Sequence, residues 1–185
     1  MSTYGFKSAT ARGEWRYSKP AVLLHWLIAI LIAAQLGIGW YMMAIEEQPG
    51  SIWYFDIHKS FGLVVLGLVV LRIIWRATHK PAALPMTVPA WQVTLIHVTE
   101  WALYLCMLAM PIIGFVGASY SKKGITFFGT PLPSWFSPNH DTAETFFGLH
   151  SIIAWVLVAL IALHALGGLK HFFIDKDRIF QRMWF

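Results

Sequence analysis

The amino-acid sequence predicts an all-α integral membrane protein, a four-helix bundle with both termini on the cytoplasmic side. Its composition is the first reason: 57% of the 185 residues are hydrophobic and 12% are charged, whereas soluble domains carry about 25% charged residues. The second reason is a set of four apolar segments, each long enough for the roughly 20-residue helix that crosses a bilayer. Their grouping along one chain favours a single membrane domain.

We place the predicted helices at about 21–45, 57–76, 93–118 and 145–169, within a domain that covers residues 20–170. Pro20 stands where proline favours the start of a helix, and Pro111 predicts a kink in the third helix. The first apolar run is too long for the core of a cleaved signal peptide, so we expect it to remain as a helix. The connection 119–144 is long, and we expect an ordered cap on the outer face.

The positions of the basic residues predict the orientation. All but three of the 14 Lys and Arg residues fall before the first helix, from the end of the second helix to the start of the third, or after the fourth. Because Lys and Arg concentrate on the cytoplasmic side, residues 1–19 and 171–185 are expected to be cytoplasmic end segments. The three exceptions are Lys59, Lys122 and Lys123. The net charge of +5 is thus explained by membrane orientation, and we expect no nucleic-acid binding.

Eight histidines are present, and five of them fall within or at the edge of predicted helices. The other three, His79, His140 and His171, fall in loops or just past helix ends. An ionisable side chain inside a membrane is costly and therefore points to function. The histidines are the residues from which we build a functional hypothesis.

Four of the membrane histidines form two predicted pairs. His150 and His164 are 14 residues apart on the fourth helix, nearly four full turns, so they share a face and lie about 21 Å apart. His25 lies near the inner end of the first helix, and His58 opens the second helix from outside. The topology therefore predicts an inner pair, His25 with His164, and an outer pair, His58 with His150.

Two facing imidazoles are what bis-histidine ligation of haem iron requires. Pairs at two depths would form an electron path across the bilayer. Two other readings stay open: a membrane histidine can be a hydrogen-bonded packing residue, and a metal or proton transporter also uses membrane histidines. Transporters, however, gather their ligands near the midplane. The sequence has no CxxCH motif, so a haem here would be held by histidine without covalent attachment.

Five stretches resemble the bacterial cytochrome b561 family, and together they cover essentially the whole chain after residue 19. They are LLHWLIA at 23–29, IHKSFGLVVL at 57–66, WALYLCMLAMPIIGF at 101–115, GLHSIIAW at 148–155 and LHALGGLKHFF at 163–173. The resemblance implies two haems b on His25, His58, His150 and His164, and electron exchange with ubiquinone in the bacterial inner membrane. One branch of the family is described as a superoxide oxidase, which implies superoxide as the external electron donor.

Lys59, Lys122 and Lys123 are the candidates for an outer mouth that attracts an anion such as superoxide. Each taken alone is better explained as an ordinary surface or interface lysine, and nearby acidic residues would oppose the attraction. They are Glu46, Glu47, Asp56, Asp141 and Glu144.

Two further candidate sets belong to the inner end. His97 and Glu100 are three residues apart and share a helix face, so they could relay protons to a quinone or be an ordinary interfacial pair. The family often has a second histidine where Glu100 stands, so this chain departs from the family pattern at that position. Arg72 and Arg76 could bind haem propionates, since guanidinium suits carboxylates, or reach lipid phosphates.

Electron transfer leaves two functional hypotheses. In the first, the chain is an oxidoreductase that passes electrons from superoxide to ubiquinone. In the second, it is the cytochrome b subunit of a larger dehydrogenase and takes electrons from an external protein partner. Co-purification of a soluble partner would favour the second hypothesis.

Overall fold

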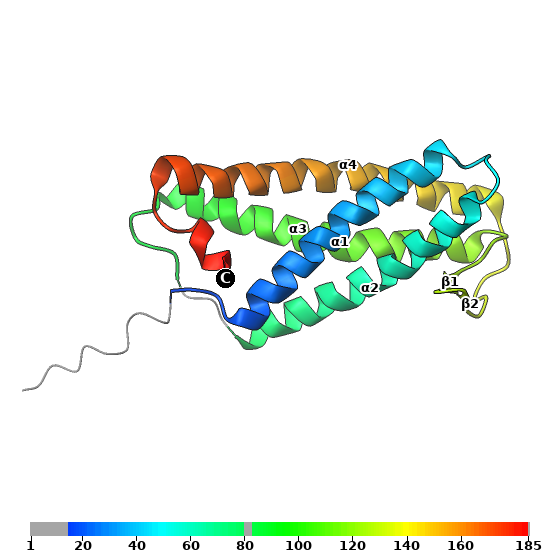
Figure 1. Cartoon of the computed structure of the whole chain (residues 1–185), viewed down its shortest axis with the longest axis horizontal. Helices are drawn as coiled ribbons and strands as arrows, with labels where there is room; N and C mark the ends of the chain where they lie inside the picture. Colours follow the sequence, from blue (N-terminus) through cyan, green and yellow to red (C-terminus); the bar gives the residue numbers. More distant parts are fainter. Residues whose placement is uncertain (1–14, 80–82, 185) are drawn as a thin grey trace, which may run out of the picture.

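A computed structural model of the chain describes residues 15–79 and 83–184, and within these ranges four helices are long and apolar enough to cross a membrane. They are α1 (Lys19–Ala44), α2 (Ser51–Thr78), α3 (Ala90–Tyr120) and α4 (His140–Lys170). Figure 1 shows them as one elongated bundle. This confirms the predicted all-α membrane fold. Of the basic residues used to predict the orientation, Lys7, Arg12 and Lys80 lie outside the described residues.

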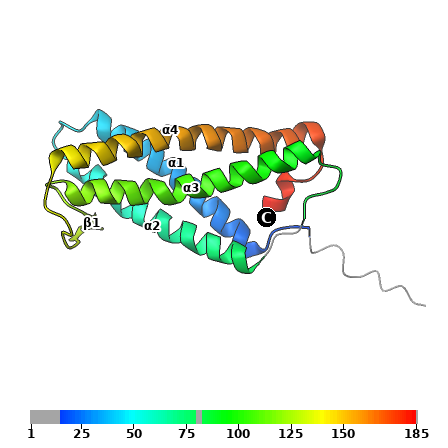
Figure 2. The same cartoon turned by 180° about the vertical axis from the view of Figure 1, so that it is seen from behind.

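The bundle is built from two helical hairpins. α1 packs mainly on α2, α3 packs mainly on α4, and α2 joins the two hairpins through its contact with α3. Figures 1 and 2 show α3 and α4 side by side along the long axis, with α1 and α2 crossing them obliquely. The backbone N–H of Tyr17 donates to the carbonyl of Arg182 at 3.2 Å, so both ends of the described chain meet. We call this the inner end, after the predicted topology.

The buried apolar core occupies the middle of the bundle. It receives side chains from all four helices, namely Ile28, Ile32, Val65, Val69, Leu103, Tyr104 and Leu157. The outward faces carry large apolar side chains that are two-thirds exposed, such as Ile30, Leu105 and Leu166. An apolar surface of this extent suits the acyl chains of a bilayer, where helices satisfy their own backbone groups.

The second helix begins at Ser51, six residues earlier than predicted. Polar residues near this start are compatible with the helix, because Lys59 and Asp56 lie on one face and form an ion pair at 2.9 Å. The expectation that His58 opens this helix was therefore wrong. His58 lies about two turns inside α2.

The fourth helix begins at His140 rather than at about 145. Asn139 caps it, since its side-chain oxygen accepts a 3.0 Å hydrogen bond from the backbone N–H of Thr142. Asp141 in the first turn adds a favourable interaction with the helix dipole. The expectation that His140 lies in a loop was wrong, because the capping signal of Asn139 was overlooked.

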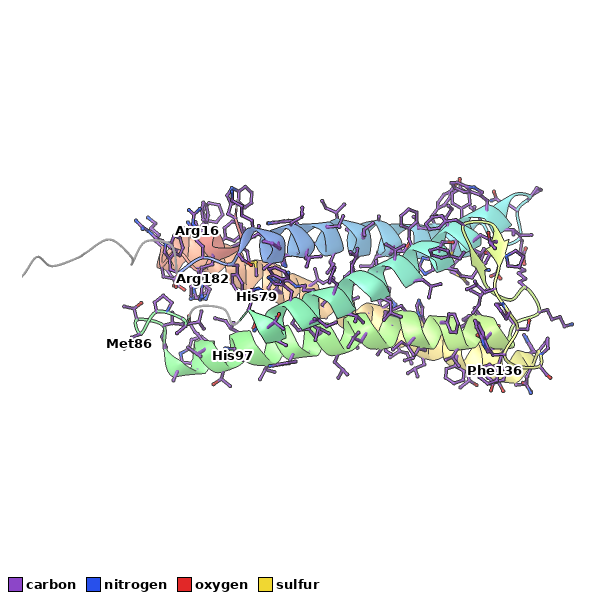
Figure 3. The ribbon with its side chains drawn as sticks, turned by 90° about the horizontal axis from the view of Figure 1, so that it is seen from below. Arg16, His79, Met86, His97, Phe136 and Arg182 are labelled. Carbon is purple, nitrogen blue, oxygen red and sulfur yellow. The ribbon has the colours of Figure 1, made fainter. Side chains whose placement is uncertain are left out.

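A two-stranded antiparallel hairpin, β1 (Thr126–Phe127) and β2 (Thr130–Pro131), lies in the connection between α3 and α4. Ser60 on α2, whose side chain is fully buried, holds it in place. The Ser60 hydroxyl accepts from the backbone N–H of Phe128 at 2.9 Å and donates to the carbonyl of Asp56 at 2.7 Å. The connection thus covers the outer end, where Figure 3 labels Phe136.

The residues after α4 continue as a short π-helix, η1 (His171–Asp175), and a 3₁₀ turn, η2 (Phe180–Met183). In Figure 1 this segment turns back from the end of α4 toward the start of α1. The chain end predicted as a tail is therefore folded onto the bundle as far as residue 184.

Replacing Ser60 by Ala should destabilise the outer end. The backbone N–H of Phe128 would lose its partner, and an unsatisfied buried donor costs about 1–3 kcal/mol. We expect a lower midpoint of thermal unfolding in detergent and faster protease cleavage within residues 121–139. Ser134→Ala, a change at an exposed position of the same connection, should behave as the unchanged chain. Equal midpoints for the two variants would contradict the role of Ser60.

Candidate functional site

The structure brings the four selected histidines together in two pairs. His58 on α2 faces His150 on α4, with ring centroids 6.1 Å apart and planes 80° apart. His25 on α1 faces His164 on α4, with centroids 6.0 Å apart and planes 61° apart. These are the outer and inner pairs. Each joins one helical hairpin of the bundle to the other.

The spacing within each pair fits two axial ligands of one metal ion. A bond from imidazole nitrogen to a metal is about 2 Å long, and the nitrogen lies about 1 Å from its ring centroid, so two opposed imidazoles on one ion have centroids about 6 Å apart. The separations of 6.1 and 6.0 Å agree with this distance. The residues present therefore fit a bis-histidine haem at each level.

His150 is held in the orientation that such a ligand needs. Its Nδ1 donates to the backbone carbonyl of Met110 on α3 at 2.9 Å, because a carbonyl can only accept. This bond fixes the tautomer and leaves Nε2 for a metal, as is usual for histidine ligands. The Nδ1 of His58 is buried and has no hydrogen-bond partner in the part of the chain that the structure describes.

Glycines beside the outer pair allow the imidazoles to approach the neighbouring helices. A Cβ at Gly114 on α3 would lie 2.9 Å from the Cε1 and Nδ1 atoms of His150, closer than real contacts permit. A Cβ at Gly39 on α1 would lie 3.3 Å from Cε1 of His58. Sequence analysis missed both residues. Gly39 follows His25 by 14 residues, the same interval as His150 to His164, and this interval could have identified it.

Gln35 is a second residue that sequence analysis missed. From α1, its Nε2 donates to the backbone carbonyl of His58 at 2.8 Å. Its position as a lone amide in an otherwise apolar run of the first helix was a visible signal. The bond ties α1 to α2 at the level of the outer pair.

The inner arginines have partners within the protein. Arg76 on α2 forms a half-buried ion pair with Glu100 on α3, with Nη2 and Oε2 2.8 Å apart. The Nη1 of Arg72 donates to the carbonyl of Ala21 at 2.7 Å. They line a cavity of about 20 Å³, together with Tyr17, Ala21, Trp75, His79 and Tyr104. A space of this size holds about one water molecule.

His97 and Glu100 differ in their surroundings, although they are one turn apart. The Glu100 carboxylate points to Arg76, whereas His97 is exposed on α3 at the inner end, where Figure 3 labels it. No hydrogen bond or ion pair joins His97 to Glu100 in the described part of the chain. The structure therefore does not bring the two together as a polar pair.

The three outer lysines are also in different environments. Lys59 pairs with Asp56, and its Nζ donates to the carbonyl of Gly124 at 3.2 Å. Lys122 and Lys123 are exposed, and the Nζ of Lys123 lies 5.2 Å from the ring centroid of Phe55. Because Asp56 neutralises Lys59, the accessible positive charge at this end belongs to Lys122 and Lys123.

Comparison with known proteins supports the same kind of site. The family model described as prokaryotic cytochrome b561 matches residues 16–185. Cytochrome b561 homolog 2 of Escherichia coli (strain K12) is 31% identical over 91% of this chain and 90% of its own length. Cytochrome b561 homolog 1 of the same organism is 30% identical over 91% of this chain and 96% of its own.

A third relative has a name that states an activity. The probable superoxide oxidase CybB of Yersinia pestis is 31% identical over 91% of this chain and 95% of its own length. Taken with the four membrane helices, the match over nearly the whole chain shows that this protein belongs to the prokaryotic cytochrome b561 family of haem b-binding membrane electron-transfer proteins.

Proposed function

We propose that the chain binds two haems b and carries electrons across the bacterial inner membrane, from superoxide outside to ubiquinone. His58 and His150 hold the outer haem, and His25 and His164 hold the inner haem. The observation that carries this proposal is the pair of facing imidazoles at each of two levels, with centroid separations that fit one iron. A packing role for these histidines would not explain two such pairs.

The inner end faces the cytoplasm in this proposal. The described basic residues there are Arg16, Lys19, Arg72, Arg76, Lys170, Lys176, Arg178 and Arg182. The outer end has only Lys59, Lys122 and Lys123 among the residues that the structure describes. This imbalance supports the assignment through the tendency of Lys and Arg to remain in the cytoplasm.

The protein supplies the geometry for electron transfer, while the haems supply the one-electron redox chemistry when bound. α4 holds one ligand of each site, about 21 Å apart along its axis. The space between the two levels is filled by the buried core, with Ile32, Val69 and Leu157 at its centre. This packing excludes water and keeps the two sites at a fixed separation.

The electron balance suits an anionic donor outside and a quinone acceptor. Two superoxide anions give up two electrons and become dioxygen, and one quinone takes up two electrons and two protons to become quinol. The relative named a probable superoxide oxidase supports this donor. The exposed ammonium groups of Lys122 and Lys123 would raise the local concentration of an anion. Glu100 and His97 remain candidates for supplying protons at the inner end.

A subunit role in a larger dehydrogenase is the second candidate function. The observation that favours it is a group of exposed aromatic side chains at the outer end, namely Phe127, Phe128, Trp135 and Phe136. Aromatic side chains are enriched at protein interfaces, so this group could receive an external protein donor. Stable co-purification of a soluble redox protein would support it over the superoxide reaction.

Removal of a histidine ligand at one level should release the haem of that level alone. The purified chain should contain two haems b, measured by the pyridine haemochrome method against protein concentration. His150→Ala should remove the outer haem alone and His164→Ala the inner haem alone, because each variant removes one ligand from one pair. His97→Ala, at an exposed histidine outside both pairs, is the matched control and should keep two haems. A chain without haem absorption would contradict the cytochrome assignment.

Gly114→Ala should disturb the outer haem selectively. The new Cβ would lie 2.9 Å from the His150 ring, so the imidazole must move from its ligating position. We expect loss of the outer haem or a shifted low-spin spectrum at that site, with the inner haem unchanged. Gly67→Ala, where a Cβ meets no atom within 4 Å, should retain both haems. Normal outer-haem spectra in Gly114→Ala would show that His150 does not need this space.

The side of the membrane at which electrons enter can be tested with superoxide that is generated outside sealed membrane vesicles. Because the superoxide anion crosses a bilayer slowly, haem reduction should be fast in right-side-out vesicles and slow in inverted vesicles. Replacing both Lys122 and Lys123 by Gln should slow the reduction several-fold at low salt. Faster reduction in inverted vesicles would contradict the orientation, and no reduction in either would favour the protein donor.

A further inference from the structure

The C-terminal segment 171–184 follows α4 directly and begins with a network of ion pairs. His171 is 6% exposed, and its Nδ1 donates to Oδ2 of Asp177 at 2.6 Å. Asp175 lies 3.2 Å from the same nitrogen and also pairs with Lys170. His171, Asp175 and Asp177 are close enough to ligate a cation, but the ammonium of Lys170 already balances Asp175. We therefore read this cluster as the anchor of the segment.

The same segment then docks on the beginning of the first helix. The indole Nε1 of Trp26 donates to the carbonyl of Met183 at 2.8 Å, and the Trp26 ring contacts that of Trp184 at 5.7 Å between centroids. Arg182 is buried, and its Nε donates to the carbonyl of Trp15 at 3.0 Å. Figure 3 shows Arg182 at the inner end, beside the start of α1.

Two contacts of the segment, one with Trp26 and one made by Phe180, lie next to the inner pair. Trp26 directly follows His25, and the two rings are 5.3 Å apart. Phe180 packs against Gly168, which follows His164 by one turn, since a Cβ there would lie 3.4 Å from the Phe180 ring. The segment therefore reaches the neighbour of each inner ligand, one on α1 and one on α4. Among the described residues, no hydrogen bond, ion pair or ring contact joins the segment to the outer pair.

We propose that segment 171–184 is a positioning part of the inner haem site, which it closes against cytoplasmic water. This inference rests on the proposed assignment of the inner haem to His25 and His164. Two contacts hold the segment in place. Trp26 binds its C-terminal part through the carbonyl of Met183, and the His171–Asp177 pair fixes its beginning. The segment sets the environment of the cofactor and leaves the ligands unchanged.

The physical consequence is a higher reduction potential for the inner haem. Oxidised haem iron carries one more positive charge than reduced iron, and water stabilises the more charged form. Burial and the hydrophobic shell are known levers on haem potential. Opening the segment should therefore favour the oxidised inner haem, whereas the outer haem should not respond.

Trp26→Phe and Asp177→Asn test the inference in the full-length, haem-loaded protein. The first removes one hydrogen-bond donor and keeps a ring; the second removes one charge and keeps the side-chain size. At a fixed ambient potential, we expect the ratio of reduced to oxidised inner haem to fall about tenfold, which is about 59 mV for one electron. Visible-spectrum redox titration measures this ratio, and the single-haem variants His150→Ala and His164→Ala assign the two signals.

Trp91→Phe is the matched control, because Trp91 is exposed at the inner end and no hydrogen bond or ring contact joins it to the segment among the described residues. It should leave both potentials unchanged. A fall of the inner potential alone in either test variant supports the inference, whereas loss of the inner haem from both variants would mean that the segment holds the ligands themselves and would contradict it. If Asp177→Asn loses both haems by misfolding, Trp26→Phe decides. An unchanged inner potential in the test variants that fold overturns the inference, whereas absence of an inner haem from the unchanged chain overturns the proposed function instead.

Discussion

The fourteen-residue interval between His150 and His164 is the constraint on which the arrangement of this bundle depends. Fourteen residues make nearly four turns, so both imidazoles leave α4 on the same face at two levels. α4 must therefore present that one face to the other hairpin along its whole length. The oblique crossing of α1 and α2 in Figure 1 meets this requirement, because each brings one histidine to one level.

The same interval recurs on the other three helices. Its members are His25 and Gly39 on α1, His58 and Arg72 on α2, and Glu100 and Gly114 on α3. The outer level thus combines two histidines with two glycines, and the inner level combines two histidines with an arginine and a glutamate. At the outer level, the two glycines leave space beside the histidine side chains. At the inner level, the arginine and the glutamate place charges at the same depth as the histidines. The two sites are built alike but differ electrostatically.

Much of the architecture could be predicted from composition and spacing. Long apolar runs identified the four helices, and helix periodicity selected the histidine pairs that the structure brings together. Helix ends were less predictable, because the Asp56–Lys59 ion pair and the Asn139 cap extend α2 and α4 into polar sequence. Apart from these histidine pairs, the contacts between helices could not be predicted. The bond of His150 to the Met110 carbonyl, the pairing of Arg76 with Glu100 and the docking of Met183 on Trp26 all depend on how distant segments pack.

The division of the bundle into two hairpins also bears on how the protein is assembled. His25 and His58 belong to the half that is translated first, and His150 and His164 belong to the half that is translated second. Neither level is complete until both halves have entered the bilayer and met. A haem bound at either level would then join the halves as a crosslink does, in addition to the contact of α2 with α3.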